Sequence, residues 1–553
     1  MSRTGGFGGL PRTDEAFDAL TADLSGRALG RIIRGSLLEG IEARLDDDVT
    51  VEDVRVGRFV VVDGARNRFF SAVHNVKLAN TNEDVLLRPP NDGFVQEVLR
   101  GTNTYATIDL RPKLLIAHGE DGVRPVKTIP PHFATVREAS DADVATVFGA
   151  EGPTSLPIGK PLEMSSDVCI DLERFVERSN AVFGKTGTGK SFLTRMLLGG
   201  VIRAELASVL VFDMHNEYGM WSEDEETKRK APALKEIFGQ KVLIFSVDPA
   251  SSRRRSVTPD YEVQIALSDI EVDDLVLLRS ELNLHDAQVR DMETLSERWG
   301  NGWLSSLLAM QEAGTLDEEL EQIPGVHAQS VKALARNLKK VARLGFVKET
   351  VTDHSADRMV KALLERRHVV IEFGGKTDFL SYMLVSSIVT RRIHERWREE
   401  KEKASADGRI GHPPQLVITL EEAHKFLSPE AAHQTIFGTI AREMRKYNVT
   451  LLVVDQRPSG IDEEIASQLG TRVIGALDDE RDQASVLEGV PDARALRVLL
   501  NNLEPKKQVL LGGYALPMPI VVEVRDYYDF AKSTRRAVGD AKGKTRDIDL
   551  WER

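Results

Sequence analysis

The chain has 553 residues, of which 41% are apolar and 29% are charged, and it carries a formal net charge of −13 and a single cysteine, Cys169. This composition is that of an ordinary globular protein with room for two to four domains, and one cysteine excludes a disulfide framework within the chain. The acidic balance disfavours a surface that binds nucleic acid everywhere, so any contact with nucleic acid must be local. The sequence has no apolar run near the roughly 20 residues of a membrane span and no apolar signal core at its start, so we expect a cytoplasmic protein with no membrane partner.

The first part of the chain favours short strands. Residues 1–25 begin with several glycines and are expected to be a flexible N-terminus. Between residues 26 and 150, β-branched runs separated by turn signals predict a small β-barrel, because no long helical pattern lies between them. These runs are 31–33, 54–62, 69–76 and 105–110. No catalytic constellation is visible among them, and we predict an adaptor domain without chemistry of its own.

Residues 151–520 predict an α/β architecture with a RecA-like P-loop NTPase core. Apolar strand candidates alternate with helical patterns, which favours a parallel, doubly wound sheet. The candidates are 181–183, 208–212, 241–247, 369–373, 415–420, 450–454, 472–476 and 508–511. We expect the core in two parts, 151–250 and 366–520, separated by a helical insertion at 251–365 and followed by a C-terminal tail at 521–553.

Several charged segments in this region have two interpretations. In the predicted helix 331–344, the apolar residues lie on one face. The basic residues lie largely on another face and form a stripe of Lys332, Arg336, Lys339, Lys340 and Arg343. Such a stripe is usually a solvated helix face and less often a DNA contact, and the same choice applies to Arg253, Arg254 and Arg255. The charged runs 223–230 and 397–406 are expected to be exposed loops or helix ends.

The most specific motif runs from Gly184 to Ser191 and satisfies the spacing of a phosphate-binding loop. Its glycines let backbone N–H groups turn toward phosphate oxygens, Lys190 would reach the β- and γ-phosphates, and the Ser191 hydroxyl would bind Mg²⁺. A glycine-rich turn with a stray Lys-Ser pair is the alternative. We expect ATP and Mg²⁺ as cofactors. The expected nucleotide-binding residues are Gly184, Lys185, Thr186, Gly187, Thr188, Gly189, Lys190, Ser191 and Phe192.

Two later strands end in polar residues that could complete this site. The apolar run 416–420 is followed by Glu421 and Glu422, which would lie at the carboxyl edge of a parallel sheet. Glu421 would support the metal, through water, and Glu422 would polarise the attacking water. Gln456, at the end of the next strand, could sense the γ-phosphate or the water. An exposed acidic strand end and ordinary loop chemistry are the alternatives.

Two arginines ahead of that last strand are candidates for a role across a subunit boundary. Arg442 and Arg445 are three residues apart and would share one face of a helix. Arginines presented in this way can stabilise transferring phosphoryl charge. Surface salt bridges are the alternative for either residue.

Together these motifs resemble the HerA family of hexameric DNA-pumping ATPases, within the HerA–FtsK group. The resemblance covers most of residues 25–525. It rests on the phosphate loop, on Phe212-Asp-Met-His-Asn-Glu-Tyr218, on Glu421-Glu-Ala-His424, on Gln456-Arg-Pro-Ser459, and on residues 442–447 and 512–520. In this family Asp213 and Glu217 match a motif whose role is either a structural turn or catalysis, and Glu421 stands where many related ATPases carry Asp.

The resemblance implies a homo-hexameric ring with ATP sites between subunits and double-stranded DNA passing through its pore. It also implies a partner that docks at the barrel end, either a NurA-like nuclease in DNA end processing or another effector in anti-phage defence. Two other functions are left open. One is a secretion or conjugation ATPase of the same group, and the other is an ATP-binding ring scaffold that activates an effector enzyme.

Overall fold

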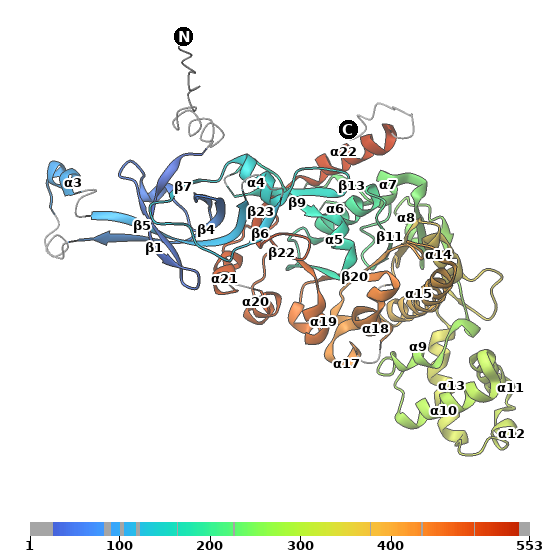
Figure 1. The fold of residues 1–553 in the computed structure, drawn as a ribbon. Coiled ribbons are helices and arrows are strands. Elements are labelled where there is room, and N and C mark those ends of the chain that lie inside the picture. The colour runs from blue at the N-terminus through green and yellow to red at the C-terminus, as the bar shows by residue number, and fades with distance from the viewer. Residues whose placement is uncertain are drawn as a thin grey trace, which may run out of the picture. The chain divides into compact units, whose positions relative to one another are not determined.

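The computed structural model describes residues 26–81, 90–99, 104–117, 122–162, 164–224, 227–376, 378–432, 435–490 and 493–540 (Figure 1). The expected flexible N-terminus lies outside these residues. The chain forms two compact units, one made of Met1–Glu151 with Gly159–Cys169 and the other of Gly152–Ile158 with Ile170–Arg553. Among the described helices, none has the length and apolar character needed to cross a membrane.

The first unit contains a closed β-barrel, which confirms the predicted fold of this region. The strand order β2-β1-β7-β3-β4-β5 returns from β5 to β2, and β6 is added beside β5. In β2, buried Ile41, Ala43 and Leu45 alternate with polar residues, the period of a strand with one face in a core. The elements are β1 Ala28–Ser36, β2 Gly40–Leu45, η1 Val51–Asp53, β3 Phe59–Asp63, β4 Asn67–Asn80, α3 Gly93–Leu99, β5 Thr104–Ala117, β6 Val123–Pro125, β7 Thr135–Glu138 and α4 Asp141–Phe148.

The second unit is built on a long sheet in the order β15-β14-β18-β11-β19-β20-β10-β21-β22-β23-β8-β9. The strands from β15 to β21 are parallel to their neighbours, as predicted. The parallel prediction is wrong for 508–511, because β22 runs antiparallel to both β21 and β23. A short apolar run predicts a buried strand, but it does not predict whether that strand runs parallel or antiparallel to its neighbours.

The strands of the sheet are β8 Ser155–Pro161, β9 Val168–Asp171, β10 Asn180–Phe183, β11 Ser208–Asp213, β14 Val242–Ser246, β15 Tyr261–Glu262, β18 His368–Glu372, β19 Leu416–Glu421, β20 Val449–Asp455, β21 Thr471–Ile474, β22 Gln508–Gly513 and β23 Ile520–Val524. The central strands, such as β10, β11 and β19, are buried along their whole length. Strands covered on both faces are apolar throughout, which is why the sequence shows them as continuous runs.

The helices of this unit are α5 Leu172–Glu177, α6 Lys190–Arg203, α7 Leu234–Phe238, α8 Pro249–Arg254, α9 Val272–Val276, α10 Asp286–Trp299, α11 Trp303–Ala313, α12 Leu316–Leu320, α13 Ala328–Ala342, α14 Ser355–Leu364, α15 Phe379–Asp407, α16 His424–Leu427, α17 Pro429–Ala432, α18 Ile436–Glu443, α19 Glu463–Gln468, α20 Glu480–Leu487, α21 Ala493–Asn501 and α22 Tyr527–Asp540. The 3₁₀ turns are η2 Gly239–Lys241, η3 Leu267–Asp269, η4 Gly300–Gly302, η5 Met444–Tyr447 and η6 Pro458–Gly460.

Helices α9 to α13 form a group of their own (Figure 1). In the sequence they lie between two short strands, β16 Ile265–Ala266 and β17 Val347–Lys348, which pair with each other in parallel. Helix α13 buries its predicted apolar face, which includes Leu334 and Leu338. On its other face, Lys332 pairs with Asp317 at 2.6 Å and Lys339 pairs with Glu312 at 2.7 Å. Pairs with exposed acids favour the solvated-face interpretation of the basic stripe.

Three further segments differ in part from expectation. Run 397–406 lies in α15, where Trp397, Glu400 and Ala404 are buried, so the prediction of exposure is wrong at these positions. The ends of run 223–230 pair as an antiparallel hairpin, β12 Trp221–Glu223 with β13 Lys230–Pro232. The segment expected as a C-terminal tail contains the end of β23 and helix α22. Phe530 of α22 packs so closely on α6 that a Cβ added at Gly199 would lie 3.0 Å from its ring.

Candidate nucleotide-binding and hydrolysis site

The phosphate loop connects the end of β10 to the start of α6. Gly187 and Gly189 adopt φ angles of +77° and +83°, a backbone region that side chains disfavour. A Cβ added at either glycine would meet no atom within 4 Å, so the backbone of the loop faces open space. An open loop at the N-terminus of a helix fits a bound phosphate group.

Lys190 is the first residue of helix α6. Its Nζ donates to the carbonyl oxygen of Lys185 at 3.0 Å. Burial lowers the pKa of Lys190, and the charges of Glu422, Asp455 and Glu421 oppose that shift. A half-buried ammonium whose hydrogen bond, among the described residues, goes to a carbonyl can exchange that contact for an anion. The Lys185 side chain points elsewhere and pairs with Asp478 at 2.9 Å.

Gln456 connects the phosphate loop to the candidate general base. Strand β20 lies between β10 and β19, so its C-terminal end separates the loop from Glu422. Thr186 Oγ1 donates to Gln456 Oε1 at 2.6 Å, and Gln456 Nε2 donates to Glu422 Oε1 at 3.2 Å. Glu422 has a φ of +48°, a strained conformation that a residue keeps only where its surroundings hold it. Three residues predicted from separate motifs therefore meet in one hydrogen-bonded chain.

Asp455 connects the ends of β19 and β20, and its role was not predicted from the sequence. It is fully buried, accepts the backbone N–H of His424 at 2.7 Å, and accepts the backbone N–H of Arg457 at 2.7 Å. His424 Nδ1 lies 2.9 Å from the same carboxylate, and this hydrogen bond raises the pKa of His424. The feature of the sequence that could have indicated this role is the charged residue at the end of the apolar run of β20.

Glu421 is buried at the end of β19, and its Oε2 accepts the backbone N–H of Met214 at 3.1 Å. Burial, followed by the charges of Asp213 and Glu217, raises the pKa of Glu421 well above its usual range. A cation would favour its ionised form. The Ser191 hydroxyl and the Glu421 carboxylate supply the hard oxygen ligands that Mg²⁺ prefers, so these residues fit the ion. In the described part of the chain, no cluster of three or more acidic, His or Cys side chains could hold a metal by itself, so phosphate oxygens would complete its coordination.

The two candidate arginines lie in different settings. Helix α18 ends at Glu443, so the prediction of a shared helix is wrong for Arg445, which lies in η5. Arg442 Nη2 donates to the Ala432 carbonyl at 3.1 Å, and its buried Nη1 has no hydrogen-bond partner among the residues that the structure describes. The Arg445 side chain is exposed. Neither donates to a phosphate-loop residue within the ranges that the structure describes. Phe192, expected to contact nucleotide, packs its ring 4.9 Å from that of Tyr527.

The turn 213–219 contacts this site through the hydrogen bond from Met214 to Glu421. Asp213 is completely buried, and its carboxylate accepts the backbone N–H groups of Glu217 and Tyr218, each at 2.8 Å. Burial, and then the charge of Glu372, raises the pKa of Asp213 to about 7. These bonds favour the structural role for Asp213. Arg255 pairs with buried Glu372 at 2.7 Å and keeps 28% of its side chain exposed, so it is attached to the sheet and is not part of a fully solvated face.

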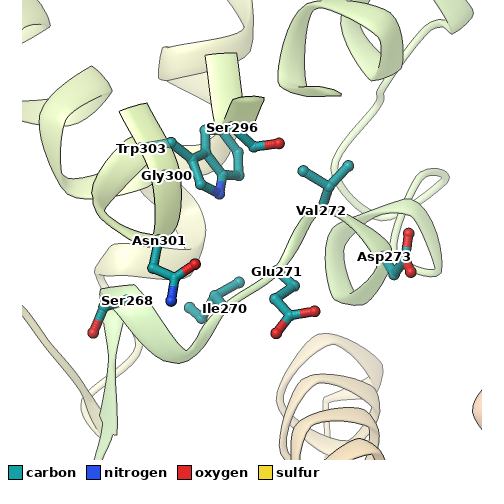
Figure 2. A pocket seen from close by; sticks show the side chains of 9 residues that line it. All are labelled: Ser268, Ile270, Glu271, Val272, Asp273, Ser296, Gly300, Asn301 and Trp303. Atoms are coloured by element: carbon teal, nitrogen blue, oxygen red, sulfur yellow. The ribbon is translucent and has the colours of Figure 1, made fainter. Parts of the chain in front are cut away.

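A separate hollow of about 270 Å³ lies among the helices of the segment 268–303 (Figure 2). Its lining combines the Trp303 indole and the apolar side chains of Ile270 and Val272 with Glu271 and Asn301. None of its lining residues belongs to the phosphate loop or to the strand ends described above. The hollow therefore has no part in the nucleotide site.

Known proteins resemble the chain over most of its length. Residues 156–393 match the family described as "Helicase HerA, central domain". The chain is 24% identical to the DNA double-strand break repair helicase HerA of Saccharolobus solfataricus, over 85% of this chain and 88% of the relative. It is 25% identical to the protein of the same description from Sulfolobus acidocaldarius, over 90% and 92%.

Among solved structures, VirB4 of Thermoanaerobacter pseudethanolicus aligns with a TM-score of 0.43 at 14% identity, over 68% of this chain and 98% of that one. The bacterial conjugative coupling protein TrwB aligns with a TM-score of 0.45 at 12% identity, over 70% and 92%. The family match and the two HerA helicases agree with the phosphate loop and strand ends found here. Residues 156–393 therefore match the HerA central domain, and the chain is similar to HerA helicases over most of its length.

Proposed function

We propose that this chain is an ATP-driven double-stranded DNA translocase or helicase. It works as a homo-hexameric ring with a NurA-like nuclease or another effector, in DNA end processing or anti-phage defence. The observation that carries the hydrolytic part is the chain Thr186–Gln456–Glu422, which brings the phosphate loop and a candidate base into hydrogen-bond contact. The relatives named as DNA double-strand break repair helicases support DNA as the track.

In this proposal each residue has a defined task. Lys190 exchanges its bond to the Lys185 carbonyl for oxygens of the β- and γ-phosphates. Glu422 accepts the proton of the attacking water, and Gln456 orients that water because its side chain already contacts both Glu422 and Thr186. Ser191 would hold Mg²⁺ and Glu421 would support it through water, and the ion would neutralise charge on the phosphates.

The ring part of the proposal assigns Arg442 and Arg445 to the ATP site of a neighbouring subunit. The exposed side chain of Arg445 suits presentation to another protomer, and arginines in trans stabilise transferring phosphoryl charge. Inactive Arg445→Ala protein mixed with inactive Lys190→Ala protein should regain part of its turnover, since each supplies what the other lacks. Failure of every mixing ratio would remove the trans role.

The decisive experiment measures steady-state ATP turnover with and without double-stranded DNA at low and high salt. We expect stimulation by DNA that weakens with salt, because the contacts are to phosphates. Lys190→Ala should abolish nucleotide binding and turnover together. Turnover that DNA never changes would overturn the translocase. Effector activation by Glu422→Gln protein that binds ATP without hydrolysing it would favour the scaffold instead.

A further inference from the structure

Three buried carboxylates stand side by side at the carboxyl edge of the sheet. Glu372 ends β18, Asp213 ends β11 and Glu421 ends β19, and these strands are consecutive neighbours. Asp213 and Glu372 are paired directly across the two strands. Side-chain exposure at Glu372 and Asp213 is 1% or less, so their charges must be met inside the protein.

One cation reaches this row from outside the sheet. Arg255 follows helix α8, and its Nη2 donates to Glu372 Oε2 at 2.7 Å and to Asn216 Oδ1 at 3.3 Å. Asn216 in turn accepts the backbone N–H of Gly374 at 2.9 Å and donates to the carbonyl of the same residue at 3.3 Å. Arg255 therefore holds the end of β18 and the turn 213–219 at the same time.

The contact is tightly fitted. A Cβ added at Gly219 would lie 2.0 Å from Glu372 Oε1, so only glycine leaves room for the carboxylate. Glu372 Oε1 and Arg255 Nε are both buried, and neither has a hydrogen-bond partner in the described part of the chain. Unsatisfied buried polar atoms destabilise a fold, so the clamp of Arg255, Glu372 and Asn216 is kept at a cost in free energy.

The turn held by this clamp acts directly on the nucleotide site. Its Met214 N–H is a hydrogen-bond donor to the Glu421 carboxylate, and the charge of its Glu217 is among those that act on Lys190. The ion pair between Arg255 and Glu372 also joins the two ends of the long segment between residues 255 and 372, which contains helices α9 to α14. A shift of this turn would move the hydrogen bond that orients Glu421.

We propose that Arg255 is a positioning residue for ATP hydrolysis, which acts through Glu372 and Asn216 to fix the turn 213–219 and hence the orientation of Glu421. This inference rests on the proposed ATPase activity. Arg255 contacts neither the phosphate loop nor Glu422, so its loss should affect the chemical step and leave nucleotide binding nearly intact.

The test compares Arg255→Gln with Arg253→Gln. Arg253 is a matched control because it lies two residues earlier, in helix α8, and forms an ion pair of the same length, 2.7 Å, with Glu262 at the surface. We expect Arg255→Gln to lower kcat about 10- to 100-fold, the usual cost of losing a residue that orients a ligand, with the Kd for a non-hydrolysable ATP analogue roughly unchanged. Arg253→Gln should leave both constants unchanged. Arg255→Lys keeps a positive charge beside Glu372 but replaces the planar guanidinium by a compact, more strongly hydrated ammonium, so its kcat should fall between the two.

Two further variants separate positioning from folding. Gly219→Ala removes no charge but displaces the Glu372 carboxylate, so it should lower kcat in the same direction as Arg255→Gln. The double variant Arg255→Met with Glu372→Met replaces the ion pair by apolar groups of similar length, which keeps the fold while removing the clamp. Each kcat is divided by the fraction of chains that bind the analogue, so unfolded protein does not count as a slow enzyme.

The outcomes are distinct. Low kcat with normal analogue affinity in Arg255→Gln, Gly219→Ala and the double variant supports the inference. Full kcat per binding-competent chain in the double variant overturns it and leaves the proposed function standing. Equal loss of analogue binding and kcat in Arg255→Gln also overturns it, because the residue would then be structural. Absence of ATP turnover in the unaltered protein contradicts the proposed function itself.

Discussion

Two regions of this molecule are rich in charge, and they treat it in opposite ways. At the carboxyl edge of the core sheet, Asp213, Glu372 and Asp455 are almost completely buried, and backbone N–H groups or neighbouring side chains donate to each carboxylate. On helix α13, Lys332 and Lys339 keep about two fifths of their side-chain surface in solvent and pair with exposed acids.

The difference shows that the position of a charge decides its effect more than its sign or number. Surface ion pairs gain little, because water screens both partners and the side chains lose entropy when they meet. Carboxylates at buried strand ends are desolvated, so every donor that reaches them fixes the geometry of a neighbouring loop. Chemistry concentrates at such an edge for this reason, and the helical face can serve solubility alone.

The largest effect should follow a change at the edge that preserves shape. Glu422→Gln removes the proton acceptor and leaves the contact with Gln456 in place. We expect turnover to fall about 10²- to 10⁴-fold, the range for loss of a general base, while the ATP analogue still binds. Single-turnover hydrolysis and analogue binding measure the two effects separately. Normal single-turnover rates would remove Glu422 from this role.

A buried base at the opposite end of β18 tests the same idea through pH. His368 Nδ1 accepts the backbone N–H of Val209 at 3.2 Å, and burial lowers the pKa of His368 to about 4. The unfolded chain takes up this proton near pH 6.5 and the folded chain does not, so folding stability is lost as the pH falls from 6.5 toward 4. This difference in the pKa of His368 between the folded and unfolded states lowers the unfolding free energy by at most about 3 kcal/mol over this pH range.

His368→Gln provides the comparison. Its unfolding free energy, measured in urea from pH 7 to pH 4, should lack this loss, so its disadvantage relative to the unaltered protein should shrink by about 3 kcal/mol across the interval. A constant difference at every pH would mean that folding leaves the pKa of His368 unchanged.

Asp455→Asn should have a smaller effect on stability. It removes the charge beside His424 and one of the acceptors for the N–H groups of His424 and Arg457, which should lower the unfolding free energy by about 1–3 kcal/mol. Because Asp455 raises the pKa of His424, the stabilisation it gives is complete below pH 6.5 and declines as the pH rises through the raised value. Urea titrations at pH 6 and pH 9 should therefore show the larger loss at pH 6. A larger loss at pH 9 would contradict the assignment of the His424–Asp455 pair.

The sequence was sufficient for those parts of the site whose signal is local. The phosphate loop, the strand ending in Glu421 and Glu422, and the strand ending before Gln456 each consist of one apolar run followed by polar residues. Residues whose role depends on distant partners could not be found in this way. Arg255 and Glu372 are 117 positions apart, and His424 and Asp455 are 31 apart.

The same limit applies to the fold. The barrel and the parallel core follow from apolar periodicity, but the antiparallel direction of β22 depends on how the chain returns through α20 and α21. Trp397 lies in a charged run and is nevertheless buried, where its indole N–H donates to the Pro414 carbonyl at 3.1 Å. Charge content along a helix describes its average exposure and does not identify the single residue that packs inward.

The smallest effect should come from the helical face. Lys332→Gln breaks the pair with Asp317, yet both side chains are about half exposed, so the unfolding free energy should fall by only about 0.2–1 kcal/mol, and the difference should vanish at high salt. Turnover with and without DNA should be unchanged, because no residue of the nucleotide site contacts Lys332. Its matched counterpart is Arg255→Gln, which also removes one ion pair of similar length. A comparable loss of turnover in both variants would mean that burial does not separate the two regions, and a loss of DNA-stimulated turnover in Lys332→Gln alone would restore the DNA-contact interpretation of the basic stripe.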